Sequence, residues 1–196
     1  MTNLKKNKFT FELHKCLCNN EKEALKQMTQ SADFIAANMT SHIYLELVER
    51  RWDNDTISAF VKIGTDEQLS VLASCIVMYS SIYPIDKVFT AMQNTKDTIE
   101  KYNLKGLFMT ACDRGDTDMV QAMIKHGCFD VQDGRPIMVI CRREIDKAHV
   151  DEELIRSVLK ALPGFTATIE ALKEKFIPLG KNAASRELVL SLLSSY

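Results

Sequence analysis

The stretch LFMTACDRGDTDMVQAMIKHG, residues 107–127, decides the fold that we expect for this chain. Its first half places Leu107, Phe108, Ala111 and Cys112 on one face of a helix. Gly115 lies at the centre of a turn, and apolar residues then recur at helical spacing until a second glycine ends the pattern, namely Val120, Met123, Ile124 and Gly127. The stretch therefore predicts two short helices joined by a tight turn.

We interpret the rest of the chain as divergent copies of this unit. One apolar anchor recurs in the second helix of each expected copy, at spacings of 32, 31, 32, 34 and 34 residues, and these anchors are Leu25, Ile57, Val88, Val120, Leu154 and Leu188. The strongest internal match has no gaps, since residues 53–64 align with residues 116–127 and five positions are identical. Periods of this size are typical of stacked helical hairpins.

Two segments carry a resemblance to a known repeat family. Residues 106–112 stand where the ankyrin repeat has TPLHLAA, and the turn at Gly115, the second helix and Gly127-Cys128 follow in the family's order. Residues 135–141, RPIMVIC, align with the same heptapeptide and keep its proline. The chain thus resembles a divergent ankyrin-repeat protein. The resemblance implies an all-α solenoid of five to six stacked ankyrin-like helix-turn-helix repeats, with a helical solenoid of another kind as the alternative.

We expect a single repeat domain over residues 1–196, with units at about 9–33, 41–66, 69–93, 104–130, 134–163 and 165–196. In the fifth unit about five extra residues, near 145–150, separate the two helices, and such insertions form surface loops. The last helix, residues 186–193, is apolar nearly all round. It is therefore either tucked against its neighbour or covered by a partner.

Composition narrows the classes of function. The chain has 196 residues, 46% of them hydrophobic, which is enough to build a core. A net charge of −1 argues against global attraction to nucleic acid or to a membrane surface. Neither a secretory leader nor a spanning segment is evident, so we expect a cytoplasmic protein whose six cysteines are reduced thiols.

Arginines recur where the first helix of several units ends, namely Arg50, Arg51, Arg114, Arg142 and Arg143. Stacked units would align them as a stripe, with Trp52 beside it, and arginine forks near an aromatic ring suit a protein-binding surface. We therefore predict these six residues as partner-binding. The alternative is that the arginines are solvated and only complement the helix dipoles, and that Trp52 packs across its hairpin.

Catalytic motifs are missing from the sequence. It has no P-loop, GxGxxG, GxSxG or HExxH, and no spacing selects a cysteine and histidine pair for nucleophilic chemistry. Two metal clusters are possible. His14 with Cys16 and Cys18 lacks the spacing of zinc sites, and three members of the second set occupy positions where the repeat has small or turn residues, the set being Cys112, His126, Cys128 and Cys141. We expect no enzyme activity, no cofactor and no metal.

Ankyrin-like proteins bind other proteins through the concave face and the inter-repeat loops, and the resemblance implies the same here. We therefore expect a protein–protein interaction module, an inhibitor or adaptor that occludes or scaffolds its partner. By analogy alone, it could be a viral or phage protein directed at a host factor. Two alternatives stay open: phosphate or nucleic-acid binding through the arginine stripe, and homodimerisation through Leu188 and Leu192 of the C-terminal helix.

Overall fold

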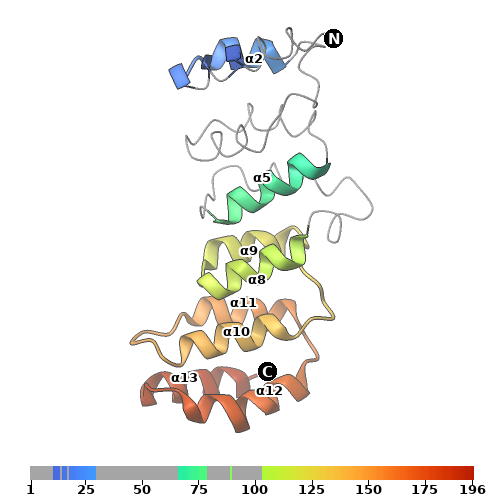
Figure 1. Ribbon diagram of the computed structural model, residues 1–196. Helices are drawn as coiled ribbons and strands as arrows, with labels where there is room; N and C mark the ends of the chain where they lie inside the picture. Colours follow the sequence, from blue (N-terminus) through green and yellow to red (C-terminus); the bar gives the residue numbers. More distant parts are fainter. Residues whose placement is uncertain (1–10, 14, 17, 30–65, 79–88, 90–102) are drawn as a thin grey trace. The chain divides into compact units, whose positions relative to one another are not determined.

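The structure is a computed structural model of the chain, and it describes residues 11–13, 15–16, 18–29, 66–78, 89 and 103–196 (Figure 1). The chain divides into two compact units, Met1–Asn103 and Leu104–Tyr196. All regular elements within the described ranges are helices, so the all-α class is confirmed for that part of the chain. No helix found there is both long enough and apolar enough to cross a membrane.

In the first unit, the structure describes parts of two expected repeats. Residues 11–13, 15–16 and 18–19 are helical, Asn20 makes a turn with φ 57°, and α2 (Lys22–Thr29) follows. Asparagine is one of the few residues that adopt this left-handed conformation readily. The helix-turn-helix expected near the N-terminus is therefore confirmed.

Helix α5 (Asp66–Met78) is the first helix of the expected third repeat. Its buried side chains recur at helical spacing and are Leu69, Leu72, Ala73, Ile76 and Val77. Residues 30–65 lie outside the described part of the chain, so the prediction of a second repeat there stays a prediction.

The second unit consists of three helical hairpins. The first is α8 (Leu104–Arg114) with α9 (Thr117–Lys125), and the second is α10 (Arg135–Glu144) with α11 (Glu152–Ala161). The third runs through α12 (Thr166–Ala171), the π-helix η2 (Leu172–Phe176) and the 3₁₀-helix η3 (Ile177–Leu179) before α13 (Ala183–Ser194). Helices α8, α10 and α12 pack side by side in one row, and α9, α11 and α13 pack in a second row (Figure 1).

The hairpin that decided the sequence analysis is confirmed in detail. Leu107, Phe108, Ala111 and Cys112 are buried on α8, and Val120 and Met123 are buried on α9, whereas Ile124 is half-buried. The turn between the two helices lies at Gly115, with φ 64°, and Gly127, with φ 65°, follows the end of α9. Both are the glycines expected at these places. Glycine adopts this conformation more readily than any other residue, which is why both helices end where they do.

All three second helices begin with the same cap. The side-chain oxygen of the residue before the helix accepts a hydrogen bond from the backbone N–H three residues later, at 3.0 to 3.2 Å, in the pairs Asp116–Met119, Asp151–Leu154 and Asn182–Ser185. Each bond satisfies an amide that has no partner inside the helix. Counted from these caps, Ser185 occupies the place of Met119 and Leu154 on the buried face. The choice of Leu188 as the anchor of the last helix was therefore wrong.

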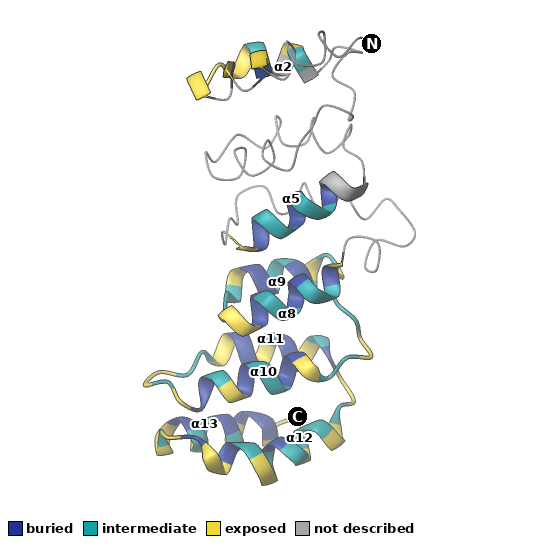
Figure 2. Ribbon diagram, viewed as in Figure 1, coloured by how far each residue is buried: buried dark blue, intermediate teal, exposed yellow. Residues whose placement is uncertain are grey.

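The last hairpin departs from regular α-helix at Leu172, where η2 begins, and Pro178 follows in η3. Proline has no N–H to donate to the carbonyl one turn earlier, so the α-helical pattern cannot continue through it. The chain instead passes through η2 and η3 before α13 starts. The outward face of α13 is small or polar, with Ala184, Glu187, Ser191 and Ser194 exposed at spacings of three and four (Figure 2). Polar outer faces of this kind are typical of terminal repeats, which stop a stack from growing.

The turn edge as candidate functional site

Three segments meet where the first helices of the second unit end, and together we call them the turn edge: residues 114–117, 142–151 and 177–182. The edge contains three of the six residues predicted to bind a partner, Arg114, Arg142 and Arg143. Arg50, Arg51 and Trp52 lie outside the described residues. The turn edge also holds the expected insertion, which forms the connection between α10 and α11.

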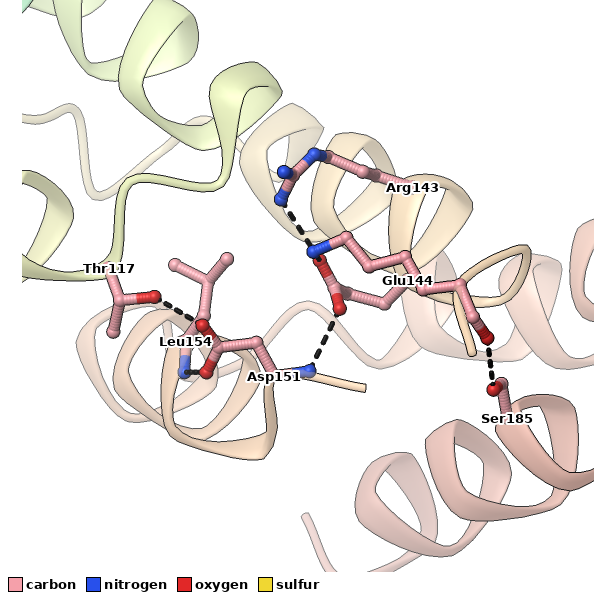
Figure 3. Close-up of polar contacts among 7 residues, drawn as sticks. Thr117, Arg143, Glu144, Asp151, Leu154 and Ser185 are labelled. Carbon is pink, nitrogen blue, oxygen red and sulfur yellow. Dashed lines mark hydrogen bonds and ion pairs between the residues drawn. The ribbon is translucent and has the colours of Figure 1, made fainter. Parts of the chain in front are cut away.

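A fully buried carboxylate organises the turn edge. Glu144 has no solvent exposure, and it accepts hydrogen bonds from Arg143 Nη1 at 3.0 Å, from Lys147 Nζ at 2.5 Å and from the backbone N–H of Asp151 at 2.8 Å (Figure 3). Both cations bond to Oε1, and the amide bonds to Oε2. The negative charge is therefore buried with partners on both oxygens, as a stable fold requires.

Asp151 extends this network to the neighbouring hairpin. Its Oδ1 caps α11, and its Oδ2 accepts a hydrogen bond from Thr117 Oγ1 at 2.5 Å (Figure 3). Burial alone would raise the pKa of Asp151, but the hydrogen bonds from Thr117 and Leu154 and the charge of Lys147 favour the carboxylate and hold the pKa below its ordinary value. The caps of α9 and α11 are thus joined by one ionised side chain.

The third hairpin holds the insertion from its other side. Ser185 is buried, and its Oγ donates a hydrogen bond to the Lys147 carbonyl at 2.7 Å (Figure 3). The backbone N–H of Lys181 donates to Asp146 Oδ1 at 2.8 Å. Met119 and Leu154 make apolar contacts at the equivalent position of the other two hairpins, whereas Ser185 makes a hydrogen bond that fixes the insertion.

The two adjacent arginines of α10 reach in opposite directions along the stack. The guanidinium of Arg143 fills the space above Gly115 in the preceding hairpin, where an added Cβ would lie 1.2 Å from Nη1. The guanidinium of Arg142 stands over the Phe176 ring of the following hairpin, 5.6 Å from its centroid, in a cation–π contact. The Arg143 guanidinium therefore lies beside the turn that follows Arg114.

These contacts divide the predicted arginines into two kinds. Arg143 is ion-paired with Glu144 and its side chain is 29% exposed, so much of its charge is used inside the fold. Arg114 and Arg142 are exposed at the surface, with Asp113 exposed beside Arg114. The turn edge therefore mixes positive and negative groups and does not form a continuous basic stripe.

The predicted self-association residues lie in different environments. Leu192 is 2% exposed and belongs to the core of the second unit, packed where α13 meets its neighbours. Leu188 is half-buried. The prediction that Leu192 offers a surface for a second copy is therefore corrected, because the stack itself covers this side chain.

A second ordered surface was missed by the sequence reasoning, the connection between α9 and α10 at residues 126–134. Phe129 packs against Phe108 with ring centroids 5.5 Å apart, and Asp130 forms an ion pair with Lys105 of α8. Asp133 binds the Arg135 guanidinium through both carboxylate oxygens at 2.6 to 3.0 Å. These contacts fix the connection, and the side chain at its tip, Val131, is 54% exposed.

The first helices continue this second surface. Met109 of α8 and Met138 of α10 occupy the same place in the two aligned heptapeptides, and both are half-buried. Methionine on a partly exposed helix face adapts its shape to different partners. The signal that could have found the connection is the pair of aspartates Asp130 and Asp133 just before Arg135 and Pro136, since acidic residues cap turns and helix starts.

All six cysteines lie within the described ranges, and none of them forms a disulfide. Cys128 belongs to the connection between α9 and α10 but is buried there. Burial raises the pKa of the thiols of Cys112, Cys128 and Cys141 to about 12, which leaves them without thiolate character near neutral pH. No group of three or more possible metal ligands occurs among the residues that the structure describes.

No protein-family model matches the chain, and neither a curated protein nor a solved structure shows a significant match.

Proposed function

We propose that the protein is a protein–protein interaction module built from ankyrin-like helical hairpins, and that it acts as an inhibitor or adaptor by covering or bridging its partners. One observation carries this proposal. The connection between α9 and α10 is fixed at Phe129, Asp130 and Asp133, yet it presents the apolar side chain of Val131 to solvent. An ordered loop that displays an apolar tip loses little conformational entropy on binding, so it is suited to a partner contact.

The half-buried methionines of the neighbouring first helices support the same surface. Met109 and Met138 lie on helices that pack side by side, and packed helices are about 8–10 Å apart, so the two side chains form a short apolar row. Apolar residues surrounded by polar ones are typical of protein interfaces. The charged residues near the row supply a polar rim, as Lys105 and Arg135 do.

The two alternatives from the sequence are less well supported. Phosphate binding needs several cations on one face whose charge is not paired within the protein, but Arg143 is paired with the buried Glu144. Self-association through the C-terminal helix needs an apolar outer face, but the exposed residues of α13 are all small or polar, namely Ala183, Ala184, Glu187, Ser191 and Ser194. Both observations favour a protein partner over these alternatives.

The test is affinity capture from a lysate of the native host with the tagged full chain. Val131→Asp places a charge at the exposed tip and is expected to reduce recovery of the partner at least tenfold, since burying an unpaired charge at an interface is costly. The matched control is Lys160→Asp, a charge change at an exposed position of α11 in the other row of helices, which should leave recovery unchanged. Equal recovery with both variants would remove the proposed surface.

A further inference from the structure

We infer that the turn edge carries a second docking surface, centred on Leu179, that binds an acidic segment of a partner protein. We call it the Leu179 surface, and it comprises Leu179 with Arg142, Lys175, Lys181 and Arg186. It lies at the carboxyl ends of the first helices, whereas Val131 lies in the connection that leads into the amino end of α10. The inference goes beyond the proposed function, because it adds a separate site and names the chemistry of what binds there.

Leu179 is 78% exposed, more than any other large apolar side chain in the described ranges. The turn that carries it is nevertheless fixed. Gly180 donates its N–H to the Ile177 carbonyl at 3.0 Å, and an added Cβ at Gly180 would lie 2.9 Å from Ile145 Cβ and 3.0 Å from Arg186 Cγ. A single exposed leucine on a mobile loop would need no explanation, but here the fold holds the side chain outward.

Two further bonds anchor the same turn from neighbouring elements. Arg186 Nη1 of α13 donates to the Pro178 carbonyl at 3.0 Å, and the Lys181 N–H bonds to Asp146 of the insertion. The insertion is in turn held by Ser185 and by the Glu144 network. The Leu179 surface is therefore ordered before any partner arrives, which lowers the entropy cost of binding.

The charges around Leu179 define the partner. Lys175 lies four residues earlier along the continuous helical backbone of η2 and η3, and Lys181 lies two residues later; both are exposed. Arg142 stands over Phe176 in η2, and the guanidinium of Arg186 reaches the Pro178 carbonyl. The exposed carboxylates on these segments and on α13 are Glu174, Asp146 and Glu187, and one oxygen of Asp146 is already occupied by the Lys181 amide. Four cations against three carboxylates, one of them already engaged, leave a positive excess that favours an acidic ligand.

A protein segment fits this surface better than a nucleic acid does. An apolar side chain at the centre needs an apolar group opposite it, and leucine offers no face on which a base could stack. The aromatic ring closest in sequence, Phe176, is half-buried and already lies under the Arg142 guanidinium. The expected ligand is thus a protein segment in which carboxylates flank an apolar residue.

The test uses the full chain and a fluorescent peptide in which glutamate and leucine alternate, followed by anisotropy. The wild type is expected to bind it, and Leu179→Ser and the pair Lys175→Glu with Lys181→Glu are each expected to weaken binding about tenfold or more. All three substituted positions are exposed, so the fold should persist, and circular dichroism checks this. The control Val131→Ser should bind as tightly as the wild type.

Two other ligands test whether the surface requires the acidic groups and whether it prefers protein to nucleic acid. The same peptide with glutamine in place of glutamate should bind at least about tenfold more weakly, and a single-stranded oligonucleotide should not compete with the acidic peptide. The inference is overturned by equal binding of the glutamine peptide, by preference for the oligonucleotide, by full binding to Leu179→Ser, or by no binding at all. The proposed function is judged separately, since loss of partner capture by Val131→Asp does not depend on Leu179.

Discussion

Replacement of Glu144 by glutamine should destabilise the second unit far more than the small chemical change would suggest. Glutamine fills the same space but carries one acceptor oxygen and one donor amide in place of two acceptors. In the native protein, Oε1 accepts from Arg143 and Lys147, and Oε2 accepts from the Asp151 N–H. Whichever way the glutamine amide turns, a donor faces a donor.

The magnitude follows from the exposure of the three donors. The side chains of Arg143 and Lys147 are 29% and 32% exposed, so both cations can turn toward water and each loss costs about 1 kcal/mol or less. An unsatisfied acceptor or N–H at the buried Glu144 position costs about 1–3 kcal/mol. We expect a decrease of about 2 kcal/mol in the free energy of unfolding, which lowers the Tm of a unit of this size by about 10 °C.

Urea and thermal unfolding followed by circular dichroism measure this change. The matched control is Glu152→Gln, which removes an ion pair to Arg156 at 3.3 Å between side chains that are 47% and 52% exposed. That pair is worth about 0.5 kcal/mol or less, so the control should unfold almost as the wild type does. If Glu144→Gln also stays within about 0.5 kcal/mol of the wild type, the account of the buried carboxylate is refuted.

Three further predictions concern the backbone, the pH dependence and the thiols. Gly115→Ala should cost about 2 kcal/mol, because φ is +64° and the new Cβ would lie 1.2 Å from Arg143 Nη1. In a double-mutant cycle followed by urea unfolding, Gly115→Ala should cost less in the Arg143→Ala background than in the wild type, and an equal cost in both would contradict the contact. The pKa of Asp151 is lowered in the folded protein, so its stabilisation is present above the ordinary value of about 3.9 and is lost as the pH falls through the folded value. Asp151→Asn should therefore show a shallower loss of stability on acidification, and an unchanged slope would speak against the assignment. The buried thiols of Cys112, Cys128 and Cys141, each with a pKa near 12, should resist alkylation at about pH 8 until the protein is unfolded, and rapid labelling seen by mass spectrometry would show that they are accessible.

The local parts of the fold could be predicted from the sequence because their signals are local. The glycines at 115 and 127 and the apolar spacing of α8 and α9 determine that hairpin without help from the rest of the chain. Helix α8 begins at Leu104, which is also where the expected fourth unit begins. Helix α5 begins at Asp66, whereas the expected third unit begins at about residue 69, because helix ends depend on caps and packing and are harder to predict than helix centres.

The turn edge could be predicted only in part, because its chemistry comes from residues far apart in the chain. Arg142 and Arg143 were placed correctly at the end of a first helix. No sequence signal indicates the cation–π contact between Arg142 and Phe176 or the contact between the Arg143 guanidinium and Gly115. The burial of Glu144 depends on the insertion folding back to bring the Asp151 N–H to it. Adjacent residues on a helix do not face each other by spacing alone, so the Arg143–Glu144 pair could not be inferred.

The anchor of the last helix was assigned to Leu188 for a related reason. Residues 186–193 are apolar nearly all round, so periodicity alone does not select a buried face. The cap at Asn182 settles the face, since it places Ser185 and Val189 inward. The irregular η2 and η3 segments shift this cap by an amount that a fixed repeat period cannot anticipate.

The central claim, that the protein binds another protein through its ordered surfaces, is tested most directly by capture from the native host lysate at low and high salt. The account predicts one dominant protein, recovered in a fixed ratio to the tagged chain at both salt concentrations, because apolar contacts around Val131 are little affected by screening. Recovery of nucleic acid that leaves at high salt, or of the tagged chain alone, would contradict it.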